Sequence, residues 1–262
     1  MLTDGQKAFF ESFGYVLMRG LLSPKEVAAI TCDVDEEWAE ARKANPDEED
    51  LTLGAIVESR RPLLQLVEDD RIYNPISKLL GPDFIWCGSE GHHSSHSTHG
   101  FHPDRTGPHD CDYLRIKLMM YLDPLDKDSG CLRVIPGSHR PPLHFEIEPD
   151  ERHQMSEIVR PYDVRGDEMP CAALESKPGD VVFFNQCLWH GVFNATPGRR
   201  YIAMKVAERP TKPEHIASLQ HYTPDIFNPH DAFIHSDRPA LQQMVKGLAE
   251  MKPDESTTTS SL

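Results

Sequence analysis

The stretch that most constrains the fold is residues 114–122, where the side chains alternate between two faces of a predicted β-strand. One face is entirely apolar, with Ile116, Leu118, Met120 and Leu122. The opposite face carries Arg115, Lys117, Met119 and Tyr121. A lysine in such a row is usually solvated, but inside a barrel that binds an anion Lys117 becomes a ligand to that anion. The pattern therefore indicates a sheet with one face in an apolar core.

Helix signals dominate the first 82 residues. Thr3 with Gln6 makes a capping-box pattern, and Gly14 supplies the helix end. Ser23 followed by Pro24 opens a second helix, whose apolar residues recur at steps of three and four. Strand signals begin near residue 83 and continue for most of the remaining chain.

We therefore predict a single domain with three parts. Residues 1–82 form a helical and strand support, residues 83–207 form a β core, and residues 208–262 form a C-terminal helical addition with a polar tail. The Pro-rich segment 140–176 is an insertion in the core. It is either a lid over the site or a surface loop, and the sequence leaves both readings open.

The bulk composition restricts the partners and the compartment. The chain has 262 residues with a formal net charge of −15, which repels phosphates and anionic membranes, so we expect neither nucleic acid nor a membrane as partner. It shows no secretory signal pattern and no apolar run of membrane-spanning length, which predicts a cytoplasmic protein. The six cysteines lack C-x-x-C spacing, which argues against structural zinc and against a disulfide framework. We expect free thiols.

The tripeptide His102-Pro103-Asp104 is the best candidate for part of a metal site. Residues i and i+2 on a strand face the same way, so an imidazole and a carboxylate can reach one ion from adjacent positions. Two histidines and one carboxylate on one face of Fe(II) leave the opposite coordination positions open. His190, far downstream, is the third ligand that we predict, and folding must bring it close.

A second histidine-rich stretch lies between Gly91 and Gly100. Its histidines, His92, His93, His96 and His99, have a mixed spacing that fixes no coordination geometry. The serine and glycine content predicts an irregular or edge segment. We expect some of these side chains to line the mouth of the site.

Several motifs occur in an order that resembles a known enzyme family. They are His102-Pro103-Asp104, Asp128-Ser129-Gly130, Pro136-Gly137-Ser138-His139, Lys177-Pro178-Gly179-Asp180 and His190-Gly191, preceded by the opening Phe13-Gly14-Tyr15-Val16. Together they resemble the phytanoyl-CoA dioxygenase family over most of residues 8–206. The resemblance implies a mainly β protein with flanking helices, built on a double-stranded β-helix, the jelly roll of cupin-like proteins. It also implies Fe(II) as cofactor, 2-oxoglutarate as co-substrate, and O2.

The family resemblance further implies an arginine, shortly after the second histidine, that binds the distal carboxylate of 2-oxoglutarate. The planar guanidinium binds both carboxylate oxygens and stays charged. Arg199 and Arg200 both stand at the start of a predicted strand, so only one of them can face inward. Aligning on Asn194 selects Arg200, with Arg199 as the alternative. Where the family often has a small hydroxyl residue this chain has Val192, so we expect Lys117 to supply one co-substrate hydrogen bond.

The implied activity is that of a dioxygenase that hydroxylates, or otherwise oxidises, a C–H bond of a small metabolite and releases succinate and CO2. Asp104 favours such oxidation over halogenation, because related halogenases have a small residue at that position. The alternative is a non-catalytic, cupin-like protein that binds a metal or small ligand through the same side chains. Zinc-dependent hydrolysis is a weaker alternative, since no general base stands at a defined spacing.

Overall fold

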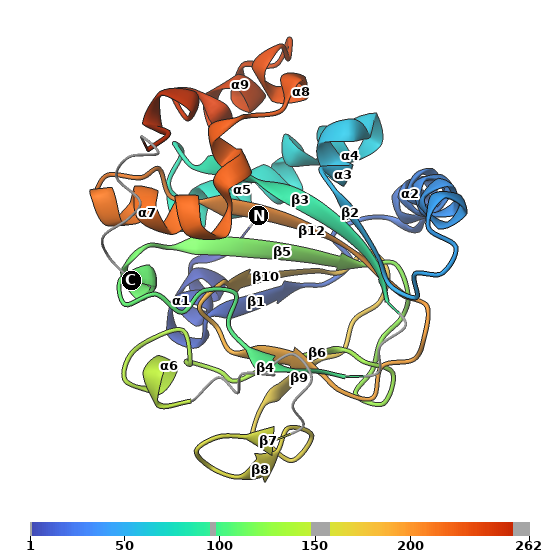
Figure 1. Cartoon of the computed structure of the whole chain (residues 1–262), viewed down its shortest axis with the longest axis vertical. Coiled ribbons are helices and arrows are strands. Elements are labelled where there is room, and N and C mark those ends of the chain that lie inside the picture. Colours follow the sequence, from blue (N-terminus) through green and yellow to red (C-terminus); the bar gives the residue numbers. More distant parts are fainter. Residues whose placement is uncertain (1, 95–97, 148–157, 254–262) are drawn as a thin grey trace.

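Two antiparallel β-sheets face each other at the centre of the molecule (Figure 1). The computed structural model describes residues 2–94, 98–147 and 158–253. The larger sheet has the strand order β1-β10-β5-β12-β3-β2, and the smaller one has the order β4-β11-β6-β9. Apart from β2 and β3, the neighbours within these two sheets are not consecutive in sequence, so strands far apart in the chain lie side by side, as a jelly roll requires.

The strands of the larger sheet are β1 (Tyr15–Met18), β2 (Leu51–Gly54), β3 (Ile85–Ser94), β5 (Arg115–Tyr121), β10 (Val181–Asn185) and β12 (Arg199–Ala207). Those of the smaller sheet are β4 (His99–His102), β6 (Leu132–Val134), β9 (Ala172–Leu174) and β11 (His190–Val192). A separate short hairpin consists of β7 (Ile158–Val159) and β8 (Val164–Arg165).

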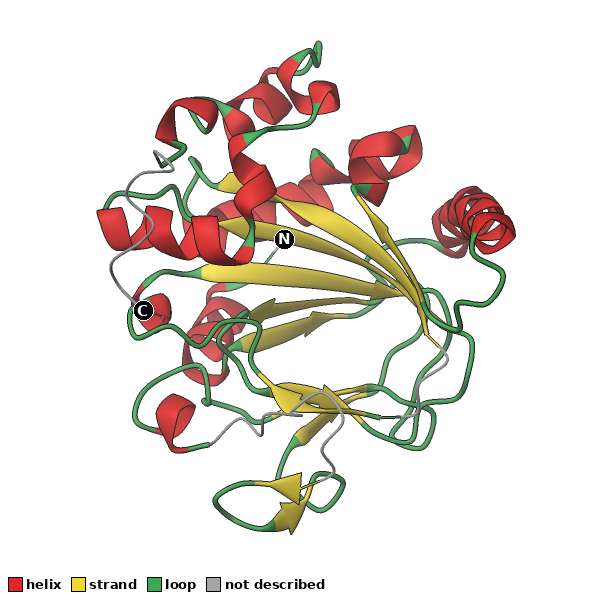
Figure 2. Ribbon diagram, viewed as in Figure 1, coloured by secondary structure: helices red, strands yellow, loops and turns green. Residues whose placement is uncertain are grey.

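Helices gather around the larger sheet, most of them on the side away from the smaller one and α1 beside the edge strand β1 (Figure 1, Figure 2). They are α1 (Asp4–Phe13), α2 (Pro24–Ala44), α3 (Ile56–Ser59), α4 (Arg61–Val67), α5 (Asp70–Leu80), α7 (Pro213–Tyr222), α8 (Asp231–Ile234) and α9 (Pro239–Val245). Short 3-10 helices are η1 (Asp110–Asp112), η2 (Pro224–Phe227) and η3 (Ala249–Met251). Helix α6 (Leu143–Glu146) lies instead near the smaller sheet (Figure 1).

The predicted helix boundaries in the N-terminal part are confirmed. The Thr3 hydroxyl accepts a hydrogen bond from the Gln6 backbone N–H at 3.1 Å, and the Gln6 side chain accepts one in return. Gly14 ends α1 with a φ of 83°, a conformation that glycine adopts without steric cost. Ser23 caps α2 in the same reciprocal way, with Pro24 at its first position.

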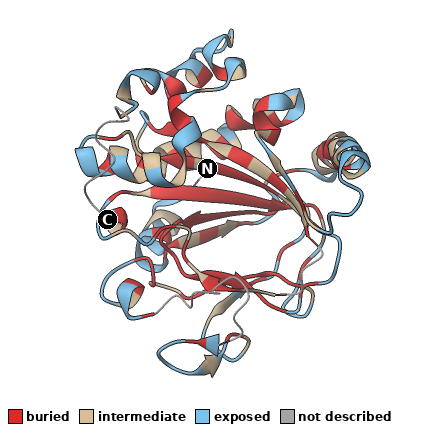
Figure 3. Cartoon of the chain, in the orientation of Figure 1, coloured by how far each residue is buried: buried red, intermediate tan, exposed pale blue. Residues whose placement is uncertain are grey.

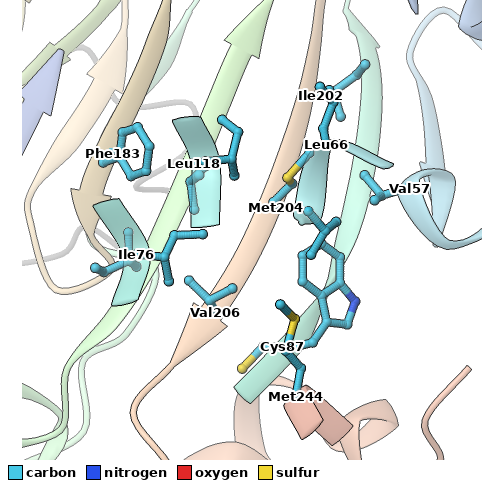
Figure 4. Packing of buried hydrophobic residues seen from close by; sticks show 14 of the residues in the cluster. Val57, Leu66, Ile76, Cys87, Leu118, Phe183, Ile202, Met204, Val206 and Met244 are labelled. Carbon is cyan, nitrogen blue, oxygen red and sulfur yellow. The ribbon is translucent and has the colours of Figure 1, made fainter. Parts of the chain in front are cut away.

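Strand β5 is buried on both faces because it lies between β10 and β12 in the larger sheet, with helices on one side and the smaller sheet on the other (Figure 3). Its apolar face packs under the helices, where Leu118 lies among side chains such as Phe183 and Met204 (Figure 4). Its other face points between the sheets, where Met119 and Tyr121 belong to a second apolar cluster. Each fully buried large apolar side chain contributes about 1.5–3 kcal/mol relative to an exposed one. The two alternating faces predicted for residues 114–122 are confirmed, because one lies under the helices and the other lies between the sheets.

The C-terminal part adds helices to the same apolar core. Leu241, Met244 and Leu248 are buried in the cluster that also holds Leu118, as predicted for a helix on the outside of the barrel. Residues 254–262, including the polar tail, lie outside the described part. No helix in the described ranges has both the length and the apolar character needed to cross a bilayer.

The histidine-rich stretch corrects one expectation. Strand β3 continues through His92 and His93 to Ser94 and pairs there with both β12 and β2, so this part is regular and central rather than irregular or at an edge. The strand was hidden because residues 88–94 contain no large apolar side chain, so the apolar–polar alternation that indicates a strand is missing there. His96 lies outside the described residues.

Within segment 140–176, α6 and the β7–β8 hairpin lie beside the smaller sheet, whereas Ala172–Leu174 form β9 of that sheet, so this end of the segment belongs to the core rather than to an insertion (Figure 1). Ile147 is buried in a cluster with Trp189 and other side chains of that sheet. Residues 148–157, which include His153, lie outside the described part. Whether the segment also forms a lid stays a prediction.

The turn Lys177-Pro178-Gly179-Asp180 leads from β9 into β10 and lies beside the segment that follows β1. The Asp180 carboxylate accepts backbone hydrogen bonds from Gly20 at 2.7 Å and Lys177 at 3.0 Å, and Arg19 donates to it at 3.0 Å. Asp180 is buried, so its removal leaves two backbone donors without an acceptor. One carboxylate thus holds two segments that are distant in sequence.

We expect Asp180→Ala to lower the free energy of unfolding by about 1–3 kcal/mol, the cost of leaving buried donors unsatisfied. Urea unfolding followed by circular dichroism measures the change. Asp128→Ala, at an exposed turn position, is the matched control and should stay within about 0.5 kcal/mol of the parent. Equal stability of the two variants would contradict this role of Asp180.

Candidate active site

The site is built on a pair of histidines that face each other across two strands. His102 ends β4 and His190 begins β11, and the two are direct partners in the antiparallel register. Side chains opposite each other in such a pair have Cβ atoms about 4.5–5.5 Å apart. The imidazole ring centroids are 4.5 Å apart. Folding therefore brings together the two histidines that the sequence analysis singled out.

Asp104 completes the group, two residues beyond the end of β4. Its Oδ1 lies 3.8 Å from His190 Nε2, and one ligand atom from each of the three residues lies within 4.8 Å of the others. Its Oδ2 is buried and has no hydrogen-bond partner among the described residues. A buried carboxylate oxygen without a donor is costly unless a cation satisfies it. We call His102, Asp104 and His190 the triad.

The two imidazoles are oriented by backbone carbonyls. His102 Nδ1 lies 2.8 Å from the carbonyl oxygen of Gly100, and His190 Nδ1 lies 2.8 Å from that of Leu188. A carbonyl only accepts, so each Nδ1 carries the proton and the lone pair is on Nε2, the nitrogen that could bind a metal. Metal-bound histidines are commonly held in this way.

The charge states also suit a metal. Burial lowers the pKa of His102 to about 3 and lowers the pKa of His190 as well, so both rings are neutral at pH 7. Burial would raise the pKa of Asp104, but Lys117 and the two histidines outweigh it and hold that pKa below its ordinary value. Two neutral imidazoles and one carboxylate are the donor set that non-haem Fe(II) takes. The residues present therefore fit the ion.

Lys117 faces the interior, the second of the two readings left open by the sequence. Its Nζ lies 3.1 Å from Glu90 Oε1 and 3.6 Å from Asp104 Oδ1. Lys205 Nζ lies 2.6 Å from Glu90 Oε2. Burial alone would lower the pKa of Lys117, but the carboxylates of Asp104 and Glu90 outweigh it and raise that pKa. Burial would likewise raise the pKa of Glu90, but the two lysines lower it to about 2.

Glu90 and Lys205 were not singled out from the sequence. The pattern that could have identified them is the alternation of side chains between the two faces of β3 and β12. Lys205 shares a face of β12 with Tyr201, and both Lys117 and Lys205 occupy the same register position on adjacent strands. The alternation was visible, but only the placement of the barrel interior shows which face meets the site.

Arg199 is the arginine that enters the barrel. It is 7% exposed, and its guanidinium lies 5.5 Å from the ring centroids of both Tyr121 and Tyr201. Nη1 is 3.5 Å from the carbonyl oxygen of Gly130, and Nε has no hydrogen-bond partner among the described residues. No carboxylate in the described ranges pairs with this guanidinium.

Arg200, which the sequence analysis preferred, points to the other side of the sheet. Its Nη1 lies 2.7 Å from Asp35 of helix α2, and its Nη2 lies 2.7 Å from Asp123. The expectation that Arg200 faces inward is therefore wrong. Adjacent residues on a strand alternate in direction, so with Arg199 inside the barrel Arg200 must face outward.

Comparison with known proteins places this geometry in a family. The family model described as Phytanoyl-CoA dioxygenase (PhyH) matches residues 10–201. The chain belongs to the phytanoyl-CoA dioxygenase family. The match begins in α1, ends in β12 and includes the whole triad. The resemblance read from the sequence is confirmed.

Individual relatives agree with this membership. The chain is 25% identical to the ectoine dioxygenase of Bordetella bronchiseptica over 261 residues, covering 84% of this chain and 83% of that protein. HygX from Streptomyces hygroscopicus, solved with nickel and 2-oxoglutarate, superposes with a TM-score of 0.60 at 18% identity, covering 79% of this chain and 87% of HygX. The epimerase SnoN, solved with Fe3+, α-ketoglutarate and nogalamycin RO, gives a TM-score of 0.53 at 21% identity, covering 78% and 84%.

The predicted fold and enzyme class are confirmed. The structural likenesses establish the mainly β, jelly-roll architecture with flanking helices. Family membership makes the chain an iron(II)- and 2-oxoglutarate-dependent dioxygenase, which uses O2. The alternative of a non-catalytic cupin-like protein is not favoured.

We expect Lys117→Met to lower the free energy of unfolding of the metal-free protein by about 3 kcal/mol, because it leaves buried carboxylates less well paired. Lys205 still faces Glu90, which places the effect at the low end of the range for broken buried pairs. Urea unfolding at pH 7 measures it. Lys127→Met, at an exposed position, is the control. An unchanged midpoint in Lys117→Met would show that Lys205 alone compensates the charge.

Proposed function

We propose that the triad binds Fe(II) and that the enzyme hydroxylates a C–H bond of a small polar metabolite. The observation that carries the proposal is the buried Oδ2 of Asp104, which has no donor among the described residues and lies beside two neutral imidazoles. Bound iron, together with 2-oxoglutarate, supplies the activation of O2. The protein itself supplies ligation, orientation and exclusion of water.

Arg199 is the proposed anchor for the distal carboxylate of 2-oxoglutarate, in place of Arg200. Its guanidinium is buried inside the barrel, is flanked by two tyrosine rings and meets no carboxylate among the described residues. A guanidinium in that state offers paired donors of the geometry that a carboxylate accepts. Arg200 already uses both of its terminal nitrogens on Asp35 and Asp123.

Lys117 is the proposed second contact to the co-substrate, in the role first expected from the absence of a hydroxyl at Val192. Its ammonium group lies close to the triad, and the carboxylates of Asp104 and Glu90 keep it charged although it is buried. The same ammonium group also pairs with Asp104. Lys117 would therefore contact the co-substrate and hold one of the proposed iron ligands in place. A charge of this kind also suits an anionic part of the substrate.

The substrate is proposed to be a small free metabolite that carries polar groups. Glu90, Lys117 and Lys205 place charges of both signs inside the barrel, which favours polar ligands over long apolar chains. The 25% identity to an ectoine dioxygenase over most of both chains supports the same choice. The cysteines are all free thiols, which supports a reducing, cytoplasmic location.

We also propose that the whole chain works as one oxygenase domain. Phe10 of α1 and Leu241 of α9, from opposite ends of the sequence, lie in one apolar cluster with the outer face of the larger sheet. Neither terminal part has a separate core of its own among the described clusters. Both ends therefore support the sheet that carries Lys117 and Arg199.

We expect His102→Ala, Asp104→Ala and His190→Ala each to lower iron affinity and succinate formation more than about 100-fold, because loss of a ligand exceeds the 10–100-fold effect of its supporting contacts. Iron content and succinate release from 2-oxoglutarate, with Fe(II) and ascorbate, measure the two effects. His93→Ala, on the outer face of β3, should keep both. Full activity in any triad variant would remove that residue from the assignment.

We expect Arg199→Gln to raise the KM for 2-oxoglutarate by about 10–100-fold, because hydrogen bonds to charged groups contribute about 1.5–3 kcal/mol and 1.4 kcal/mol is tenfold. Arg200→Gln, one residue away, is the matched control and should leave this KM unchanged. Steady-state kinetics over a range of 2-oxoglutarate concentrations distinguishes them. The opposite pattern would restore Arg200 as the anchor.

A further inference from the structure

A second group of metal-ligating side chains lies outside the triad. Cys111 belongs to η1, His144 belongs to α6, and Cys187 follows β10. One ligand atom from each lies within 4.8 Å of the others. We propose that these three residues, which we call the thiol cluster, bind Zn2+. This proposal does not depend on the assignment of the iron ligands.

The histidine of the thiol cluster is oriented as a ligand. His144 is 2% exposed, and its Nδ1 lies 2.9 Å from the carbonyl oxygen of Cys187 and 3.2 Å from that of Ser138. Two carbonyl acceptors fix the proton on Nδ1, so the lone pair is on Nε2. A metal-binding histidine is commonly held by its other nitrogen in this way. The ring is therefore set in the tautomer that a cation requires.

The two sulfurs differ in exposure and in charge state. Cys187 is fully buried, whereas Cys111 is half-buried. The hydrogen bond between the two sulfurs lowers the pKa of Cys111 and, together with burial, raises the pKa of Cys187, so the pair holds one thiolate more readily than two. A thiolate is the form that binds metal, and metal binding releases the remaining thiol proton.

The geometry and the charge fit zinc. Tetrahedral Zn2+ with Zn–S bonds of about 2.3 Å places two sulfurs roughly 3.8 Å apart. Atoms that already lie within 4.8 Å reach this arrangement by a shift of about 1 Å, and Cys111 is in a three-residue helix near the surface. Two thiolates neutralise the ion. Nearby Arg105 is paired with Asp110 at 3.5 Å and adds no net charge.

Zinc and thiolates match by softness, since sulfur ligands with imidazole select Zn2+ over the harder Mg2+ and Ca2+. Three protein ligands leave the fourth tetrahedral position to water on the side of Cys111. The triad has no sulfur and an oxygen donor, so the two groups differ in the metal they prefer. The chain thus offers one site for iron and another for zinc.

The thiol cluster joins three segments that hold the active-site strand. Cys187 stands three residues before His190, and the Trp189 indole N–H donates to the carbonyl oxygen of His144 at 3.0 Å. A bound ion fixes η1 and α6 to the turn that leads into β11. Zinc bound here stabilises the position of β11 without touching the substrate, and its three protein ligands distinguish it from the closed, four-ligand structural sites.

Cobalt(II) titration of the reduced, full-length protein tests the proposal. Thiolate-to-cobalt charge transfer gives an intense near-ultraviolet band, and cobalt bound at the triad gives none because the triad has no thiolate. We expect a band that saturates at one equivalent and persists in Asp104→Ala. It should disappear in Cys111→Ser and Cys187→Ser. Cys32→Ser, on the exposed side of α2, is the matched control and should keep it.

Further measurements keep the test decisive if one of the variants fails to fold. Cys187 is fully buried, so circular dichroism must show folded protein before its result counts; Cys111→Ser and His144→Gln then carry the test. Zinc content of about one per chain in the parent, lost in Cys111→Ser, supports the site. No charge-transfer band in the reduced parent overturns it. A Cys111–Cys187 disulfide found by peptide mass spectrometry, with a reduced form that binds no cobalt, overturns it in favour of a redox pair.

Discussion

The structure depends on the antiparallel pairing of β4 with β11, which sets His102 directly opposite His190. Every other property of the triad follows from that register. Asp104 reaches the rings because it continues the chain two residues beyond β4, and the backbone carbonyls at Gly100 and Leu188 turn both rings the same way. A shift of one residue in either strand moves one imidazole to the far face of the smaller sheet. The register of β4 against β11 therefore also fixes the geometry of the proposed metal site.

The barrel interior combines buried charge with buried apolar surface. Lys117, Glu90, Lys205 and Asp104 form a compact group in which each charge has an opposite neighbour. Isolated charges in such a place are costly, whereas a balanced group is tolerated and keeps polar groups available to ligands. The opposite face of the same strands packs under the helices (Figure 4). One sheet thus separates a polar reaction space from the apolar core that stabilises it.

Much of this was readable in the sequence, and the failures have physical causes. The capping boxes at Thr3 and Ser23 and the alternation of β5 are local signals, so they were predicted correctly. The choice between Arg199 and Arg200 depended on which face of β12 meets the barrel interior, and only the tertiary fold decides that. The thiol cluster was missed because its ligands have no C-x-x-C spacing, and only tertiary folding brings Cys111 to Cys187.

The ion pairs of Arg200 with Asp35 and Asp123 have a consequence for the register of β12. Arg199 and Arg200 face opposite sides of the sheet, and among the described residues only Arg200 meets carboxylates. A slip of β12 by one residue would turn Arg200 toward the tyrosines of the barrel interior and separate it from both aspartates. Two salt bridges on the outside of the sheet therefore help to keep the proposed 2-oxoglutarate anchor on the inside.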